Sequence, residues 1–396
     1  MPGEVIQMNL KNKYNLFYFI YCIVGCCLAG FVAVFLQYKG VSNTLIGLVT
    51  GIGCVSSVFL SPYLSGLIVR VEKLTAMNML TGIYSFIAAV FLLLAFMPLP
   101  SAVVVGAYII IYSVYVAVAS FPQVIASGYM QDGEDIDFGL ARGLGSASWA
   151  ITALVMGPIV DFFSPVTLAI GFLMGHIAMV ILLKTMPEPQ SAHKTGEKGG
   201  SVFGIIKKYK VYFMVLVGFA FCLAAHSCLG TYLSNIVANL GGSTSMYGVT
   251  VFLMALSEMP VMAVASRWMK KVDSLTLITI GGIAYVIRNF TVCLAPNMLV
   301  LIIGLLFQSV SYGLLTAVVT YYVIYNLEAA DQVMGQAMIG MITSGFGSTV
   351  GNMLGGVLQD TYGLGAMFVF ACALTAIGAV VIFAAKAMDI KQKKTA

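Results

Sequence analysis

Two charged residues lie inside apolar stretches of the chain, where an ionised side chain is costly. Glu258 is the only charged residue between Tyr247 and Ser266, and Arg288 is the only one in the apolar run 275–294. A charge at the centre of a bilayer costs about 3 kcal/mol or more, and such residues usually face a partner or a water-filled cavity. Glu258 and Arg288 therefore mark a candidate site for a proton or a polar solute.

The two charges are expected at a similar depth in adjacent helices. Counted from Lys270 and Leu275, both lie about 18–20 Å from the same end of their helices, at 1.5 Å per residue. One interpretation is a structural ion pair that locks the C-terminal half, because buried pairs often serve specificity. The other is a binding site, which is favoured because these are nearly the only deep charges in the chain.

Other polar residues in apolar runs extend the candidate site. Arg142 and Trp149 lie seven residues apart, on one helix face. Arg142 is interpreted as a boundary cation or as a hydrogen-bond donor, and Trp149 as a packing residue or as a flat platform for a ligand ring. Gln308 is expected to face a cavity, because an amide in lipid is costly. Weaker substrate-binding candidates are His226, Gln123 and Tyr232.

The composition identifies the environment of these residues. The chain has 396 residues, of which 60% are hydrophobic and 9% are charged, whereas soluble proteins carry about 25% charged residues. The long unbroken apolar runs favour helices of about 20 residues over a membrane β-barrel. We predict an all-α membrane protein with twelve transmembrane helices, at 14–36, 44–68, 74–96, 101–126, 138–163, 165–185, 210–236, 246–268, 275–294, 297–325, 334–358 and 363–386.

Several other function classes are disfavoured by the sequence. The eight cysteines lie in apolar runs without metal-ligand spacing, so no metal site or cofactor is predicted. Neither a His-Glu-x-x-His motif nor a nucleophile elbow occurs, so an enzyme is not expected. The net charge of +5 reflects basic loops and not a nucleic-acid surface. The predicted partners are a lipid bilayer and a small-molecule substrate, and the protein is expected to be monomeric.

Lysine and arginine predict the orientation of the helices. An even number of helices places both termini on one side, and most basic loop residues fall on that side, whereas the other side has Lys39 and little else. Because basic loops stay in the cytoplasm, both termini are predicted to be cytoplasmic. The expected location is a bacterial-type cytoplasmic (inner) membrane.

The chain divides into two similar halves. A polar segment separates two groups of six runs, which predicts an N-terminal six-helix bundle at 1–186, a cytoplasmic linker at 187–209 and a C-terminal six-helix bundle at 210–396. Residues of the first half recur in the second at one constant offset, including Gly40 with Gly241 and Gly47 with Gly248. Pseudo-symmetric halves of this kind are typical of transporters whose substrate site lies between them, near the midplane.

These features resemble the major facilitator superfamily, and more narrowly the lactose permease group of oligosaccharide–nucleoside:proton symporters. The resemblance implies that Arg142 binds a sugar and that Trp149 stacks on it. It also pairs Glu258 in LSEMP and Arg288 in AYVIRNF with that group's helix-8 glutamate and helix-9 arginine. The helix-5 segment FGLARGLGSASWA carries the motif residues at the group's spacing: Phe138, Gly139, Arg142 and Trp149.

The sequence also departs from that group. The sugar-binding glutamate of helix 4 has no counterpart in SFPQVIASGYMQ. The group's helix-10 histidine and proton-carrying glutamate align with Gln308 and Ser311, and its lysine aligns with Leu305. The resemblance therefore does not imply galactoside specificity, and proton coupling cannot use the permease's own carrier.

The sequence favours a secondary active transporter that couples a small polar solute, of the sugar or nucleoside type, to protons by alternating access. Glu258 is the predicted proton-coupling residue. One alternative is an uncoupled facilitator or an exporter of a small aromatic or organic acid, for which two arginines are suitable. An alternative of another class is a transport-inactive membrane receptor or assembly partner.

Overall fold

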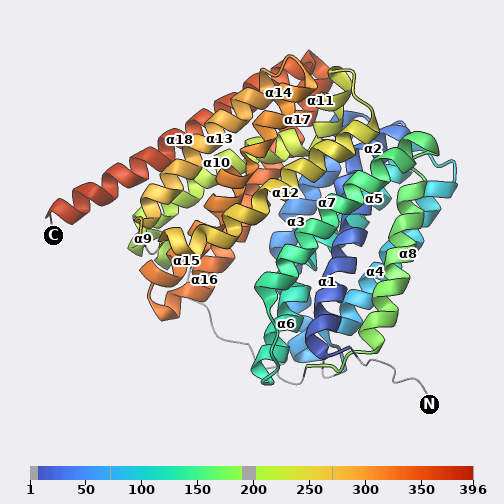
Figure 1. Ribbon diagram of the computed structural model, residues 1–396, viewed down its shortest axis with the longest axis horizontal. Helices are drawn as coiled ribbons and strands as arrows, with labels where there is room; N and C mark the ends of the chain where they lie inside the picture. Colours follow the sequence, from blue (N-terminus) through green and yellow to red (C-terminus); the bar gives the residue numbers. More distant parts are fainter. Residues whose placement is uncertain (1–7, 72, 190–201, 270, 396) are drawn as a thin grey trace.

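The computed structural model describes residues 8–71, 73–189, 202–269 and 271–395, and these residues form helices and connecting loops without a β-strand. Figure 1 labels the elements along the chain. Their bounds are α1 (Leu10–Gly25), η1 (Cys26–Gly30), α2 (Val32–Tyr38), α3 (Asn43–Arg70), α4 (Ala76–Phe96), α5 (Ser101–Ala117), α6 (Phe121–Gln131), α7 (Phe138–Phe162), α8 (Thr167–Lys184), α9 (Val202–Lys208), α10 (Lys210–Thr231), α11 (Leu233–Asn239), α12 (Thr244–Met269), α13 (Ser274–Cys293), α14 (Met298–Leu306), η3 (Ser309–Gly313), α15 (Leu314–Asn326), α16 (Ala329–Ile339), η4 (Gly340–Gly347), α17 (Ser348–Tyr362) and α18 (Leu364–Thr395).

The predicted all-α membrane fold is confirmed. Within the described residues, ten helices are long and apolar enough to cross a membrane. The two other predicted spans, 246–268 and 334–358, fall on α12 and on α16, η4 and α17, and for these two the count of twelve stays a prediction. Three predicted spans contain a π-helical segment, namely η1, η3 and η4. Such segments widen the helix locally and often occur at functional sites.

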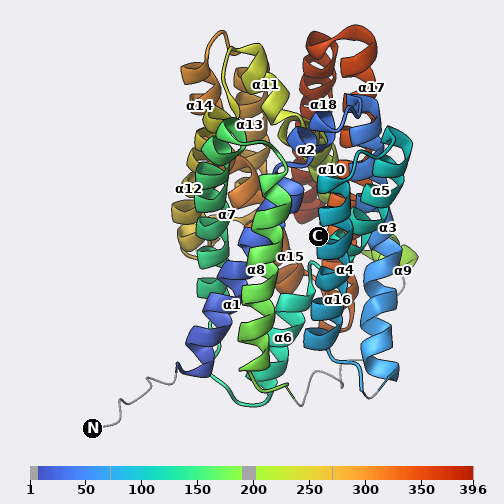
Figure 2. The same ribbon diagram turned by 90° about the vertical axis from the view of Figure 1, so that its right-hand side faces the viewer.

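The helices form two groups. In Figure 1, α1–α8 lie together on the right and α9–α18 on the left, and the two groups diverge towards the lower edge of the view. Figure 2 shows the same helices running roughly parallel when the molecule is turned by 90°. We call the end where α1 begins the N-terminal face and the opposite end, where α3 and α12 begin, the distal face.

The predicted linker is only partly described, because residues 190–201 lie outside the described residues, and the exact domain boundaries stay a prediction. The described part of the predicted linker includes the short helix α9, which is held to the second group by ion pairs. The Lys208 ammonium lies 2.7 Å from the Glu328 carboxylate and 2.9 Å from that of Asp331. These bonds raise the pKa of Lys208 above its ordinary value. The end of the linker that contains α9 is therefore anchored to the second group.

The two groups meet closely at the distal face, where related glycines of the repeat occupy equivalent places. A Cβ on Gly47 of α3 would lie 2.3 Å from the carbonyl oxygen of Asn352 in α17. A Cβ on Gly248 of α12 would lie 2.3 Å from the carbonyl oxygen of Ala153 in α7. Glycine is thus required at both crossings, because any side chain would push the helices apart. The same offset pairs Gly40 and Gly241, whose φ angles of 75° and 78° favour glycine.

Two aspartates connect the groups across the same face. The Asp161 carboxylate, at the end of α7, accepts hydrogen bonds from the backbone N–H groups of Thr244 (3.0 Å) and Ser245 (2.6 Å) at the start of α12. Asp360, at the end of α17, accepts bonds from the Thr44 backbone N–H (2.6 Å) and the Asn43 side chain at the start of α3. A carboxylate is favourable at a helix N-terminus because it satisfies free N–H groups and complements the helix dipole.

Neutral side chains add to the closure on the α3–α17 side. Four amides from both groups form one hydrogen-bonded cluster, with distances of 2.6–2.9 Å: Gln37, Asn43, Asn235 and Gln359. The buried Tyr232 hydroxyl donates to the carbonyl oxygens of Asn43 and Asn352. Tyr232, a predicted substrate-binding residue, therefore lies in the interface between the groups at the distal face, and its substrate role stays a prediction.

We predict that Asp360→Ala and Asp161→Ala each loosen the distal face. Loss of a capping carboxylate costs about 1 kcal/mol, so the helix starts that it holds should open more often. Hydrogen–deuterium exchange should rise at residues 43–50 in Asp360→Ala and at residues 244–250 in Asp161→Ala.

Asp137→Ala is the matched control, because Asp137 caps α7 within its own group by accepting from Leu140. It should raise exchange at the start of α7 alone. Unchanged exchange in both distal variants would show that these aspartates do not hold the groups together.

Candidate functional site

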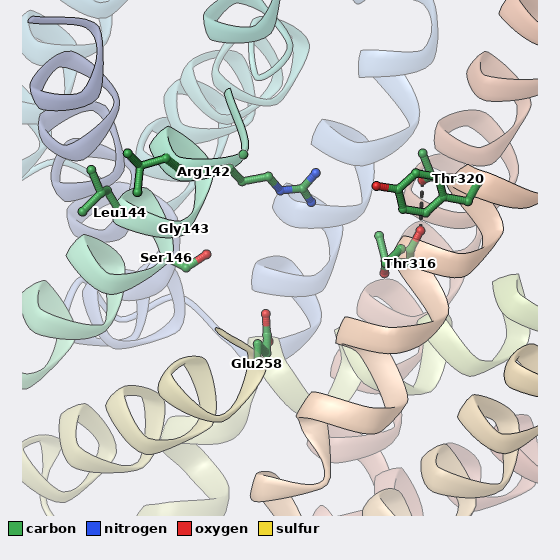
Figure 3. Close-up of a pocket in the computed structure, with 11 residues that line it drawn as sticks. Arg142, Gly143, Leu144, Ser146, Glu258, Thr316 and Thr320 are labelled. Carbon is green, nitrogen blue, oxygen red and sulfur yellow. Dashed lines mark hydrogen bonds between the residues drawn. The ribbon is translucent and has the colours of Figure 1, made fainter. Parts of the chain in front are cut away.

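A cavity of about 570 Å³ lies between α7, α12 and α15. Figure 3 shows its labelled side chains around one open space. The lining residues come from both groups of helices: Gly139, Leu140, Arg142, Gly143, Leu144, Ser146, Glu258, Thr316, Ala317, Thr320 and Tyr321. Ligand pockets typically measure about 300–1,000 Å³, so the cavity is large enough for a small organic solute.

Helix α7 provides the wall of the cavity that belongs to the first group of helices. The Asp137 side chain caps its first turn, and Arg142 and Ser146 follow four residues apart on one face. Arg142 is exposed, and in Figure 3 its guanidinium reaches into the open space above Glu258. The structure thus brings together Arg142 and Glu258, which sequence reasoning selected from separate halves.

Among the described residues, no salt bridge joins Glu258 to Arg288. The Gln308 side chain lies beside the carboxyl of Glu258. Arg288 is 1% exposed and donates to the Asn289 amide oxygen at 2.6 Å, with its other terminal nitrogen 3.9 Å from the Met254 sulfur. The two charges still attract each other electrostatically, but each has its own neighbours.

Arg288 belongs to a buried polar chain inside the second group. The Asn289 amide nitrogen donates to the Thr375 hydroxyl of α18 at 2.7 Å, and both residues are fully buried. Arg288, Asn289 and Thr375 therefore link α13 to α18. Sequence reasoning missed Asn289 and Thr375, although a polar residue next to a buried arginine was a usable signal.

The π-helical segment η3 places further polar groups beside Glu258. Gln308 immediately precedes η3, and the Tyr312 ring within it stacks on His226 at 5.1 Å with an interplanar angle of 6°. Tyr285 packs edge-on against His226 at 6.2 Å. The Gln308 amide oxygen and the His226 Nδ1 atom are buried without a hydrogen-bond partner. Buried polar atoms are nearly always paired, so these are positions where water or a solute group could bind.

Trp149 and Gln123 do not line the cavity. The indole of Trp149 packs against α1 and η1, where a Cβ on Gly25 or Gly30 would lie 3.2 Å from the indole. The Trp149 carbonyl also accepts from the Cys26 thiol within η1, at 3.6 Å. Gln123 is exposed on α6. The packing interpretation of Trp149 therefore agrees with its contacts, and the stacking role of Trp149 and the substrate role of Gln123 stay predictions.

Sequence reasoning also missed the wall opposite Arg142. Thr316 and Thr320 lie four residues apart on α15 and line the cavity. The Thr320 hydroxyl donates to the Thr316 carbonyl at 2.9 Å, whereas the Thr316 hydroxyl oxygen is buried without a partner. The spacing of two threonines on one helix face was the available signal, but it is common in membrane helices that bond to their own backbone.

This combination defines the class of protein. A helical membrane protein with two joined groups of helices, and a cavity between them that carries a few polar side chains, has the architecture of a membrane transporter. Family comparison makes the assignment specific: residues 11–370 match the model of the MFS_1 like family, and the chain belongs to this family of major facilitator transporters. The chain is accordingly a multi-pass membrane protein of a transporter family.

Known relatives are distant. The chain is 24% identical over 233 residues to the "Uncharacterized transporter YwbF" of Bacillus subtilis, covering 59% of this chain and 58% of that protein. It is 20% identical over 246 residues to the "Maltose permease" of Geobacillus stearothermophilus, covering 62% of each. The matched segments thus span less than two thirds of the length of both relatives.

Solved structures share the fold over nearly the whole chain. A mutant of the nucleoside transporter NupG superposes with a TM-score of 0.80 and 16% identity, covering 96% of this chain and 100% of that one. A bacterial homologue of the lysosomal transporter Spinster, inward-facing and unoccupied, gives a TM-score of 0.67 with 10% identity over 96% of this chain and 97% of that one. At these identities the likeness shows the fold alone.

We predict that Thr375→Val destabilises the protein by about 0.6–2 kcal/mol, the range for a hydrogen bond between membrane helices. The substitution leaves the buried Asn289 amide without its acceptor. The measurement is the thermal unfolding of the purified protein in detergent. Thr279→Val is the matched control, because its hydroxyl bonds only to the Leu275 carbonyl of its own helix. Equal effects of the two substitutions would contradict a link between α13 and α18.

Proposed function

We propose that this transporter is a proton-coupled symporter of a small polar organic solute, of the sugar or nucleoside type, and that it works by alternating access. One observation carries the proposal: Arg142 of the first group and Glu258 of the second line one cavity, while the distal face is closed by Asp161 and Asp360. A solute that contacts both walls would be released or admitted only as the groups rock about it.

The chemistry of the cavity supports a neutral, hydroxyl-bearing solute. Arg142 offers only donors, the ionised Glu258 offers only acceptors, and Ser146 offers both. A sugar or the ribose of a nucleoside carries hydroxyl groups that donate and accept, so it satisfies both walls. Two similar proteins, a maltose permease and a nucleoside transporter, agree with this class.

Glu258 is the proposed proton-coupling residue. Its carboxyl lies beside the Gln308 side chain and forms no salt bridge among the described residues. Its protonation therefore depends on the water and solute that reach the cavity. If the solute hydroxyl binds better to one protonation state, then solute and proton binding are linked, and each promotes or opposes the other by the same factor.

The proposed orientation follows from the basic loops. Basic residues near the N-terminal face are Lys11 at the start of α1 and Arg70 at the end of α3, and Lys208 lies at the end of α9. Basic loop residues favour the cytoplasm. With both termini in the cytoplasm of a bacterial-type inner membrane, the closed distal face would be the outer one. This structure would then be the inward-facing state of a monomer.

A second candidate is an uncoupled facilitator or exporter of a small organic acid. Arg142 favours it, because this cation lines the cavity and forms no salt bridge in the described part of the chain. Glu258 argues against it, since it would repel an anion whenever it is ionised. Uptake with and without a pH gradient separates the two candidates.

We predict that Glu258→Gln abolishes solute accumulation driven by a pH gradient but retains exchange of solute across the membrane. The amide keeps the shape and the hydrogen bonding but cannot carry a proton. Proteoliposomes should be tested with labelled glucose, maltose, uridine and adenosine. Glu188→Gln is the control, since Glu188 bonds to Thr75 and Asn78 outside the cavity. Accumulation by Glu258→Gln at the wild-type level would remove Glu258 from the coupling role.

A further inference from the structure

We infer that Gly143 sets the size of solute that the cavity admits, and that it is kept free of a side chain to make room for a second ring. This inference rests on the proposed transport function and concerns its specificity. Gly143 lines the cavity on α7, between Arg142 and Ser146, and faces the open space in Figure 3.

Neither the backbone nor the packing requires glycine at this position. Gly143 lies in the interior of α7, and it is not among the glycines with positive φ. A Cβ built on Gly143 would meet no atom within 4 Å. Glycine weakens a helix interior relative to alanine, so neither helix stability nor packing explains the missing side chain here.

Gly145, two residues along the same helix, shows what a packing requirement looks like. A Cβ there would lie 2.6 Å from the Tyr18 ring and 2.7 Å from the Cys22 sulfur. Gly145 therefore allows α1 to approach α7, whereas Gly143 borders the cavity. The two glycines lie on different sides of α7 and differ in what their missing side chains leave room for.

The clearance at Gly143 adjoins the residues that are proposed to bind the solute. The residue adjoins Arg142, the proposed hydrogen-bond donor, and the opposite wall consists of Thr316, Ala317 and Thr320 on α15. A one-ring solute held between Arg142 and Glu258 needs only part of a cavity of about 570 Å³. A solute with two linked rings, such as a nucleoside or a disaccharide, would place its second ring against the bare backbone of α7.

The test replaces Gly143 with alanine, valine and leucine and measures exchange of four solutes in proteoliposomes. Glucose has one ring, whereas maltose, uridine and adenosine have two or more. The leucine variant should lower exchange of the larger solutes by about tenfold or more, as expected for overfilling a packed space. It should leave glucose within about twofold of wild type, and the alanine variant should have a smaller effect on each solute.

Gly106 is the matched control. It also lies in a helix, α5, and has open space around its missing Cβ, but it does not line the cavity. The same three substitutions at Gly106 should not discriminate between solutes. An equal loss for every solute at Gly143 would show instead that glycine is needed for helix packing in another conformation. Either that result or unchanged exchange of all solutes would overturn the inference.

A second measurement is independent of transport. The variant Gly143→Cys should react with both a small methanethiosulfonate and a bulky maleimide, because its thiol would face an open cavity. Failure of the bulky reagent alone would overturn the inferred clearance. If wild-type protein exchanges none of the four solutes, the proposed function fails, while the labelling still decides whether Gly143 borders a wide space.

Discussion

The structure depends on the high cost of an unpartnered charge or polar group in a low-dielectric environment. A chain with so few charged residues can keep a carboxylate and a guanidinium deep within its helices only where other groups or water stabilise them. Arg288 is stabilised inside one group of helices, by Asn289 and through it by Thr375. Glu258 lies at the boundary between the groups, where the Gln308 side chain is beside it and the cavity is open to it. Arg288 therefore stabilises the packing of one bundle, whereas Glu258 is open to the cavity.

The distal face shows how the same physics allows two bundles to separate. The contacts that join them include glycine crossings, capping carboxylates and neutral amides, which can be hydrated when they are exposed, and also apolar contacts such as the ring pair Phe31–Tyr247. The Asp161 and Asp360 carboxylates are already exposed to solvent, so opening the face replaces their bonds to backbone N–H groups with bonds to water. The apolar contacts across the interface resist opening, because separation would transfer apolar area into water. The closure thus combines polar contacts that water can replace with apolar contacts that oppose separation.

Much of the fold could be predicted from the sequence, because lipid requires long apolar helices and the repeat relates the two halves. The predicted spans correspond to helices in the structure, and the paired Gly47 and Gly248 occupy equivalent crossings. The site was only partly predictable. Depth counting placed Glu258 and Arg288 in one layer, but it could not show that Arg288 turns towards Asn289 and Met254. Helical periodicity gives the face of a residue only relative to its own helix, so the positions of Tyr232 and Trp149 required the packing of neighbouring helices.

The cavity joins these levels, because its two walls belong to bundles that are linked mainly at the other end of the molecule. Arg142 and Glu258 are close enough to share a solute only in arrangements that bring α7 and α12 together, and the Gly248 crossing fixes that approach near the distal face. A rocking motion about such a crossing changes the width of the cavity more than it changes the crossing itself. The residues proposed to bind a solute and the residues that set the helix approach therefore lie on the same two helices. In the proposed mechanism, solute contacts at one end of α7 and α12 would act on the closure at the other end through these two helices.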